Sequence, residues 1–179
     1  HSYATPGSFS TQTTIIDLEK KKKLVNLERL KVTKDGKAFN SPDFNFWGVT
    51  FAEDSDRFYA TLSSRGTTYL VVGSVSGRTA RVLREDVECP SLSPDGTKIA
   101  FKKRIGKSSR WRLHVLDVST LRDHPLAETR SVDDQAEWLD DGRVLYGLES
   151  SVWVVPADGS GAPRRLLESA DSPAVVRAA

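Results

Sequence analysis

The sequence predicts an all-β protein built from repeated units of about four strands, and three observations lead to this fold class. Short runs rich in Val, Ile, Leu, Tyr, Phe and Trp recur along the 179 residues, each bounded by Gly, Pro, Asp or Ser, which is typical of strands and turns. No stretch of eleven or more residues has the apolar spacing of an amphipathic helix, i, i+3, i+4 and i+7. A strand–turn–strand unit returns after 41 and then 46 residues, measured at Phe51, Leu92 and Trp138. A period of about 40 to 45 residues with four strands per repeat indicates the blades of a β-propeller.

Three segments carry the first two strands of this unit, and their turns align on an aspartate. The segments are FWGVTFAEDSDRFYATLS (46–63), ECPSLSPDGTKIAFKKR (88–104) and DQAEWLDDGRVLYGLE (134–149). Third strands follow at TTYLVVGSV (67–75), WRLHVLDV (111–118) and SVWVVPAD (151–158). Fourth strands follow at ARVLRE (80–85), DHPLAET (123–129) and PRRLLES (163–169). We therefore expect complete blades over residues 46–85, 87–129 and 133–169.

The two ends of the chain suggest a fourth, divided blade. Residues 2–27 resemble residues 58–83 and would supply a second, third and fourth strand, while SPAVVR (172–177) looks like a first strand. Residues 28–45 are expected to form a hairpin insertion, with an Asp-Gly turn at Asp35 and Gly36. The segments 2–27 and 171–177 could close a four-bladed ring, which would remove the open edges. Alternatively, the chain is part of a six- to seven-bladed ring, completed by further sequence, a partner or a second copy.

Composition and charge exclude some classes of function. The net charge of +2 is too small to support nucleic-acid binding, and the lysine run from Lys20 to Lys23 is expected to be a solvated turn. No apolar run is long enough to span a membrane. Cys89 is the only cysteine, so the chain has no internal disulfide.

No catalytic or metal-binding pattern is found in the sequence. The histidines are His1, His114 and His124; we expect His114 to pack between blades and His124 to lie on the surface. The segment GSVSG has Val75 where a nucleophile elbow needs serine, and Cys89 has no second cysteine for a zinc site. We therefore expect no catalytic residue, no metal and no cofactor.

The loops between blades are the best candidates for a binding site, because loops that lead into first strands share one rim of a propeller. Acidic, amide and aromatic side chains recur in or beside four of these loops. The predicted partner-binding residues are Asp43, Asn45, Trp47, Glu88, Asp133, Asp134, Gln135 and Asp171. A basic peptide, a basic protein loop or a cation would suit this face. The alternative is that the aspartates cap turns and that Trp47 packs between blades.

The segment PSLSPDGTKIAF (90–101) resembles the Ser-Pro-Asp-Gly repeat of TolB-like β-propellers. The turn has a physical rationale, because Pro sets φ, Asp accepts backbone donors and Gly tolerates a positive φ. The resemblance implies a non-enzymatic, extracytoplasmic scaffold that binds a protein or peptide. Similar propellers also occur in peptidases of the prolyl oligopeptidase type, whose catalytic groups lie in a separate α/β-hydrolase domain. The alternative is thus that the chain is the propeller portion of a larger hydrolase. That hydrolase would be either a peptidase of this type or a carbohydrate-active enzyme.

Overall fold

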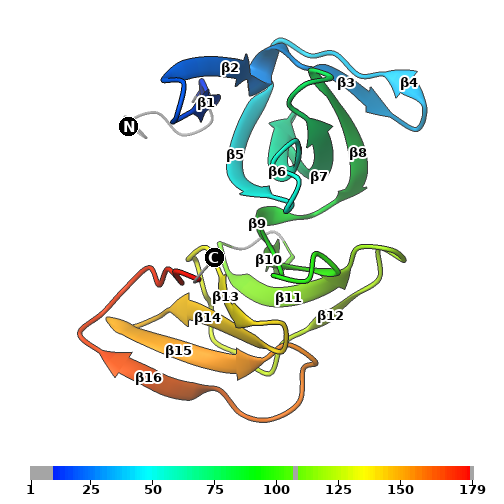
Figure 1. The fold of residues 1–179 in the computed structure, drawn as a ribbon. Coiled ribbons are helices and arrows are strands. Elements are labelled where there is room, and N and C mark those ends of the chain that lie inside the picture. Colours follow the sequence, from blue (N-terminus) through cyan, green and yellow to red (C-terminus); the bar gives the residue numbers. More distant parts are fainter. Residues whose placement is uncertain (1–9, 107–108, 178–179) are drawn as a thin grey trace.

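The computed structural model describes residues 10–106 and 109–177, and nearly all of their regular structure is β-strand (Figure 1). The strands form four sheets. Within the described ranges the single helical element is the short 3₁₀ turn η1 (Leu27–Arg29), and no helix there is long and apolar enough to cross a membrane. The predicted all-β fold class is confirmed.

Three four-stranded antiparallel units follow one another along the chain, and Figure 1 shows them in succession across the molecule. We call them blades 1 to 3. Blade 1 consists of β5 (Asn45–Phe51), β6 (Arg57–Ser64), β7 (Thr67–Ser74) and β8 (Thr79–Glu85). Blade 2 consists of β9 (Glu88–Leu92), β10 (Lys98–Arg104), β11 (Trp111–Asp117) and β12 (Asp123–Pro125). Blade 3 consists of β13 (Glu137–Asp140), β14 (Arg143–Gly147), β15 (Ser151–Pro156) and β16 (Arg164–Glu168).

The turn between β9 and β10 shows why the Ser-Pro-Asp-Gly sequence is suited to a hairpin. Asp95 Oδ1 accepts hydrogen bonds from Ser93 Oγ at 2.6 Å and from the Thr97 amide at 3.0 Å. The hydrogen bonds from Ser93 and Thr97 lower the pKa of Asp95 to about 2 although partial burial opposes this. Gly96 has a φ of +70°, which glycine adopts without steric cost. Asp95 therefore fixes the geometry of the turn.

Apolar side chains between neighbouring blades form the core. One cluster, which includes Tyr59 and Phe101, joins blade 1 to blade 2, and another, which includes Leu113 and Tyr146, joins blade 2 to blade 3. Trp138 of β13 is completely buried in the second cluster. Its indole Nε1 donates to the carbonyl oxygen of Ser91 at 2.8 Å, which links the first strands of blades 2 and 3.

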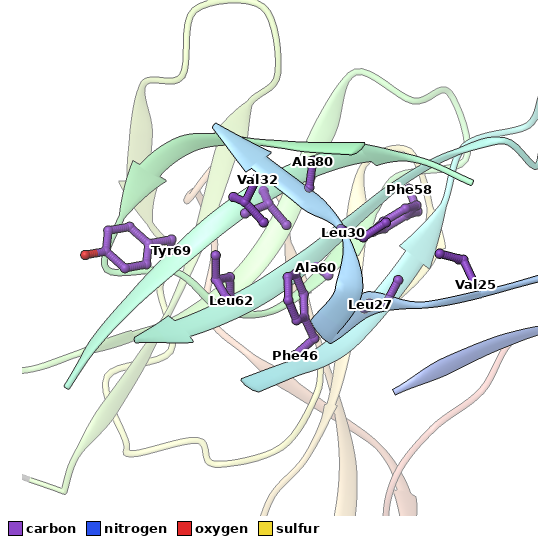
Figure 2. Close-up of a cluster of buried hydrophobic side chains, with 11 residues drawn as sticks. Val25, Leu27, Leu30, Val32, Phe46, Phe58, Ala60, Leu62, Tyr69 and Ala80 are labelled. Carbon is purple, nitrogen blue, oxygen red and sulfur yellow. The ribbon is translucent and has the colours of Figure 1, made fainter. Parts of the chain in front are cut away.

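The segment before blade 1 covers the outer face of that blade. β1 (Thr14–Asp17) and β2 (Lys22–Asn26) pair only with each other, while β3 (Lys31–Lys34) and β4 (Lys37–Ala38) form a hairpin. β3 also pairs in parallel with β8, so blade 1 becomes part of a six-stranded sheet. Figure 2 shows Val25, Leu27, Leu30 and Val32 packed over Phe58 and its neighbours in blade 1. The second strand expected at residues 2–9 lies outside the described residues.

The last described segment, residues 171–177, differs from the expected strand. It has no regular secondary structure and lies against blade 3, not beside β1 and β2. Val175 packs against the apolar cluster of Leu145, Val152 and Val154, and the Arg177 guanidinium donates to the carbonyl oxygen of Trp138. Apolar burial therefore holds this segment on the outer face of blade 3. The described residues do not close a four-bladed ring.

Candidate functional site

A pocket of about 480 Å³ opens between blades 1 and 2, beside the loop that leads into β9. It is formed by the turn between β6 and β7, the start of β9, the end of β10 and the start of β11. Its lining residues are Gly66, Thr67, Thr68, Asp86, Glu88, Lys102, Arg104, Gly106 and Trp111. Glu88 is the only predicted partner-binding residue among them, and two more, Asp133 and Trp47, contact the neighbouring side chains described below.

Lys102 is the centre of this site, because its ammonium joins side chains from three segments. Only 8% of its side chain is exposed, and Nζ donates to Asp133 Oδ1 at 2.5 Å. Nζ also lies 4.9 Å from the centroid of the Trp111 ring, a cation–π contact. Burial alone would lower the pKa of Lys102, but the hydrogen bond to Asp133 and the negative charges nearby raise it. Lys102 is therefore a fixed cation whose charge is largely balanced by Asp133.

Glu88 lies on β9 directly opposite Lys102 and is also nearly buried, with 9% of the residue exposed. The pKa of its carboxyl group is raised, because the effect of burial exceeds the opposing effect of the positive charges of Lys102 and Arg104. The ion pair with Arg104 is long, 3.7 Å between Oε1 and Nη2. Glu88 thus presents a carboxylate at the wall of the pocket, opposite Lys102 and with a long ion pair to Arg104.

Arg104 and Trp111 complete the pocket, although sequence reasoning did not select them. The Arg104 guanidinium lies 4.6 Å from the centroid of the Trp111 ring and is about half exposed. Together with Lys102 these residues occupy the end of β10 and the start of β11, KKR and W in the sequence. The sequence offered one signal that could have selected Arg104 and Trp111. This signal is a basic run at the end of one strand, followed by an aromatic residue at the start of the next.

Asp43 and Asn45 serve as structural caps near the pocket. Asp43 accepts hydrogen bonds from Ser64 Oγ at 2.7 Å and from the Arg65 amide at 2.6 Å, which fixes the turn between β6 and β7. Hydrogen bonds from Ser41, Arg65 and Ser64 lower the pKa of Asp43 to about 2. The buried Asn45 side chain accepts from the Thr11 amide at 2.7 Å and donates to the Asp43 carbonyl oxygen at 3.0 Å. Both residues thus shape the loop before β5.

Trp47 lies on β5 where this strand approaches β9. Its side chain contacts Cys89, whose thiol has a pKa raised mainly by burial. The two strands are so close here that a Cβ on Gly48 would lie 2.8 Å from the Cα of Cys89, and Gly48 has a φ of +59°. Glycine is therefore required at this crossing, and the half-buried Trp47 side chain reaches Cys89 of blade 2 there.

Asp134 and Asp171 lie toward blade 3. Asp134 Oδ2 accepts from the Gly147 amide at 2.8 Å, and Oδ1 accepts from the Gln135 amide at 2.9 Å. Gln135 and Asp171 are exposed, and Asp171 precedes Ser172, whose backbone approaches Gly147. The structure thus brings Glu88 and Asp133 together around Lys102, while the other predicted residues form separate groups. A common partner for all eight stays a prediction.

The described histidines take part in contacts between strands and blades. His114 Nδ1 lies 2.7 Å from Asp123 Oδ2, and burial lowers the pKa of its imidazole although Asp123 opposes this. His124 Nε2 lies 2.9 Å from the Ala157 carbonyl oxygen in blade 3. Across residues 10–106 and 109–177, no group of three or more His, Cys, Asp or Glu side chains is placed to hold a metal ion.

Comparison with solved structures shows that the fold is a β-propeller. The β-propeller domain of the Trilobed protease from Pyrococcus furiosus superposes with a TM-score of 0.54 at 18% identity, over 69% of this chain and 42% of that one. A protein assigned as TolB from Agrobacterium tumefaciens gives 0.54 at 12% identity, over 73% and 57%. Pyrococcus horikoshii acylaminoacyl peptidase gives 0.52 at 17% identity, over 69% and 25%.

These similarities concern the fold. No protein-family model matches the sequence, and no curated protein matches it. The match spans between about a quarter and three fifths of the length of the three solved structures. The resemblance inferred from the Ser-Pro-Asp-Gly turn is therefore confirmed at the level of the propeller fold.

Proposed function

We propose that this chain is a non-enzymatic propeller scaffold that binds a protein or peptide through the pocket between blades 1 and 2. The observation that carries the proposal is Glu88, a nearly buried carboxylate at the pocket wall whose charge is only weakly paired. A buried charge is costly unless it is well paired. A ligand that supplies a cation there regains part of this cost, which is a common basis of specific recognition.

The chemistry of the pocket favours a basic group on the partner, such as a lysine, an arginine or an amino terminus. Asp86 lines the pocket beside Glu88, and the hydroxyl groups of Thr67 and Thr68 can accept further hydrogen bonds. Lys102 and Arg104 are both engaged, the first with Asp133 and both with Trp111. We therefore assign recognition of the ligand to the acidic side chains.

Binding of short blocked peptides to the purified chain tests this proposal. We expect a peptide with one central arginine or lysine to bind, and the same peptide with norleucine to bind at least about tenfold more weakly. Glu88→Gln should remove this preference while leaving the fold intact. Glu53→Gln, a matched change in the exposed turn between β5 and β6, should leave it unchanged. Equal affinity of wild-type and Glu88→Gln chains for the basic peptide contradicts the proposal.

The second candidate function is the propeller portion of a larger hydrolase. The similarity to the propeller domain of a protease and to part of an acylaminoacyl peptidase supports it. Two observations separate the candidates. A catalytic α/β-hydrolase domain encoded beside this chain favours the hydrolase, whereas the encoded protein without such a domain favours the scaffold. Peptidase or esterase activity of the purified chain alone would overturn the scaffold.

The scaffold proposal includes an extracytoplasmic location, which follows from the resemblance to TolB-like propellers. It also includes self-association as one way to complete the ring, because the described residues leave the ring open. Sedimentation analysis of the purified chain measures this directly. Val175 lies on the outer face of blade 3. If the wild-type chain forms a dimer and Val175→Asp prevents it, this supports completion of the ring by a second copy. A monomer at all concentrations contradicts it.

A further inference from the structure

Blade 1 carries a second pocket, of about 580 Å³, on the part of its sheet that β3 extends. This pocket is separate from the candidate site between blades 1 and 2, and the two share no lining residue. The residues that line it are Lys31, Thr33, Arg57, Val72, Gly73, Ser74, Thr79, Ala80 and Arg81. They come from β3, β6, β7 and β8 (Figure 1).

Strand register places the basic side chains of this pocket on one face of the sheet. Arg57, Ser74, Thr79 and Lys31 are successive cross-strand neighbours on β6, β7, β8 and β3. Arg81 of β8 is two residues from Thr79, so it points to the same face. β3 is the strand added in parallel to the outer edge of the blade, and Lys31 is its first residue. The pocket thus exists in this form because of the inserted hairpin.

The positive charges of the pocket are poorly compensated within the described part of the chain. Lys31 and Arg81 are exposed, and neither has a salt-bridge partner there. Arg57 has only a contact with Asp54 at 3.7 Å, with more than half of each side chain exposed, and such pairs are weak. Asp56 is directed into the turn between β7 and β8, where it accepts from Ser74 Oγ and the Ser76 amide, both at 2.7 Å.

The floor of the pocket is apolar. Val72 is half buried there, and the buried backbone of Gly73 lies beside it. A Cβ on Gly73 would lie 2.2 Å from the ring of Phe58, which packs against the backbone at this point. Phe58 is one residue from Arg57 and packs on the opposite face of the sheet, so it requires glycine at position 73 from the side away from the basic side chains.

We propose that this pocket binds an organic oxyanion, a carboxylate or a phosphate that carries an apolar group. The guanidinium groups of Arg57 and Arg81 and the Lys31 ammonium would hold the oxygens. The hydroxyl groups of Thr33 and Thr79 would donate further hydrogen bonds, and Val72 would contact the apolar group. The pocket has the size of small-molecule sites. No aromatic side chain lines it, so stacking of nucleic-acid bases has no support here.

Titration of the full chain with phenyl phosphate, benzoate and inorganic phosphate tests this proposal, with binding followed by calorimetry or by NMR shifts of blade 1 amides. We expect phenyl phosphate to bind more tightly than inorganic phosphate, because of the apolar floor, and its affinity to fall as salt is raised. Benzoate tests whether the pocket accepts a carboxylate as well as a phosphate. If benzoate binds about as tightly as phenyl phosphate, the site accepts both. Neutral phenol should not bind.

Variants with matched charge changes locate the site. Arg81→Gln and Lys31→Gln should each weaken phenyl phosphate binding roughly tenfold, and Thr79→Glu, which adds a carboxylate between them, should abolish it. Lys37→Gln, an equal charge change on the exposed β4, should leave it unchanged. Because all four positions are exposed or part of an edge hairpin, we expect unchanged circular dichroism. Three results would each overturn the proposal. They are an affinity for phenyl phosphate that Thr79→Glu leaves unchanged, equal effects of Lys37→Gln and Arg81→Gln on that affinity, and no binding of phenyl phosphate at all.

Discussion

At the scale of single residues, Asp123 connects blades 1 and 2 more directly than any side chain selected from the sequence. Its carboxylate accepts from Arg84 Nη1 of blade 1 at 2.7 Å and from Lys103 Nζ at 3.2 Å, and it lies beside His114. Burial alone would raise the pKa of Asp123, but the hydrogen bonds and positive charges of Arg84 and Lys103 lower it to about 2. The carboxylate is therefore fully charged at neutral pH and serves both blades.

Replacement of Asp123 by asparagine should lower the free energy of unfolding by about 2–3 kcal/mol at neutral pH, because it leaves Arg84 and Lys103 without their counterion. The folded pKa lies below the usual value near 3.9, so this stabilisation is present above pH 4 and is lost as the pH falls toward 2. Urea denaturation at several pH values measures the difference. Asp35→Asn, in the exposed turn between β3 and β4, is the control and should change stability by less than about 0.5 kcal/mol.

Glu88 provides a pH-dependent prediction for the candidate site. Its pKa is raised above the ordinary 4.5 by burial, so the carboxyl group takes up a proton at a higher pH than an exposed glutamate does. A basic peptide should therefore bind less tightly as the pH falls through this raised value, since protonation removes the charge that it pairs with. Peptide titrations between pH 4 and 8 measure the effect. Glu88→Gln should give weak binding with a flat pH profile, and an unchanged profile would contradict the assignment.

Residue types in loops were predictable from the sequence, but their partners were not. Glu88 and Asp133 could be selected because they lie in loops that lead into first strands. Lys102 was not selected, because it lies within a strand and its ion-pair partner Asp133 is 31 residues away. Two of the other predicted residues, Asp43 and Asp134, turned out to accept backbone amides, the structural alternative that short acidic side chains always offer.

At the scale of elements, β13 shows how one strand holds two blades together. Trp138 is fully buried, and its indole hydrogen-bonds to the Ser91 carbonyl oxygen of β9. Trp138→Ala should lower the free energy of unfolding by about 3–5 kcal/mol, the cost of a large buried cavity. Trp138→Phe should cost less, because it keeps most of the apolar contact and loses the hydrogen bond. Thermal and urea denaturation measure both, and a loss below about 1 kcal/mol for the alanine variant would contradict the packing.

The hairpin of β3 and β4 shows which part of an element can be predicted locally. The Asp-Gly turn at Asp35 and Gly36 joins β3 and β4, which pair with each other. The parallel pairing of β3 with β8 depends on contacts about 48 residues apart, such as Lys31 with Thr79, and on the packing of Val32 in the core of blade 1. No local pattern of residues encodes this pairing, so the six-stranded sheet and the pocket on it emerge only in the folded structure.

At the scale of the whole molecule, each blade is packed against its neighbours in sequence. The cluster around Tyr59 and Phe101 joins blades 1 and 2, and the cluster around Leu113 and Tyr146 joins blades 2 and 3. The repeat period predicted this serial arrangement. It did not predict where residues 171–177 would lie, because that depends on the apolar surface around Val152 that blade 3 offers. In such arrays stability is close to a sum of single repeats and the interfaces between them.

A change in one outer blade should therefore act mainly on that blade. Phe58 is completely buried in blade 1, so Phe58→Ala should remove about 3–5 kcal/mol of local stability. In hydrogen–deuterium exchange, protection of amides in β5 to β8 should fall strongly, while protection in β14 and β15 should fall much less, because the blade 2 interfaces separate them. Val144→Ala in blade 3 is the matched variant and should give the reverse distribution. An equal loss of protection in all three blades for both variants would show that the chain unfolds as one cooperative unit.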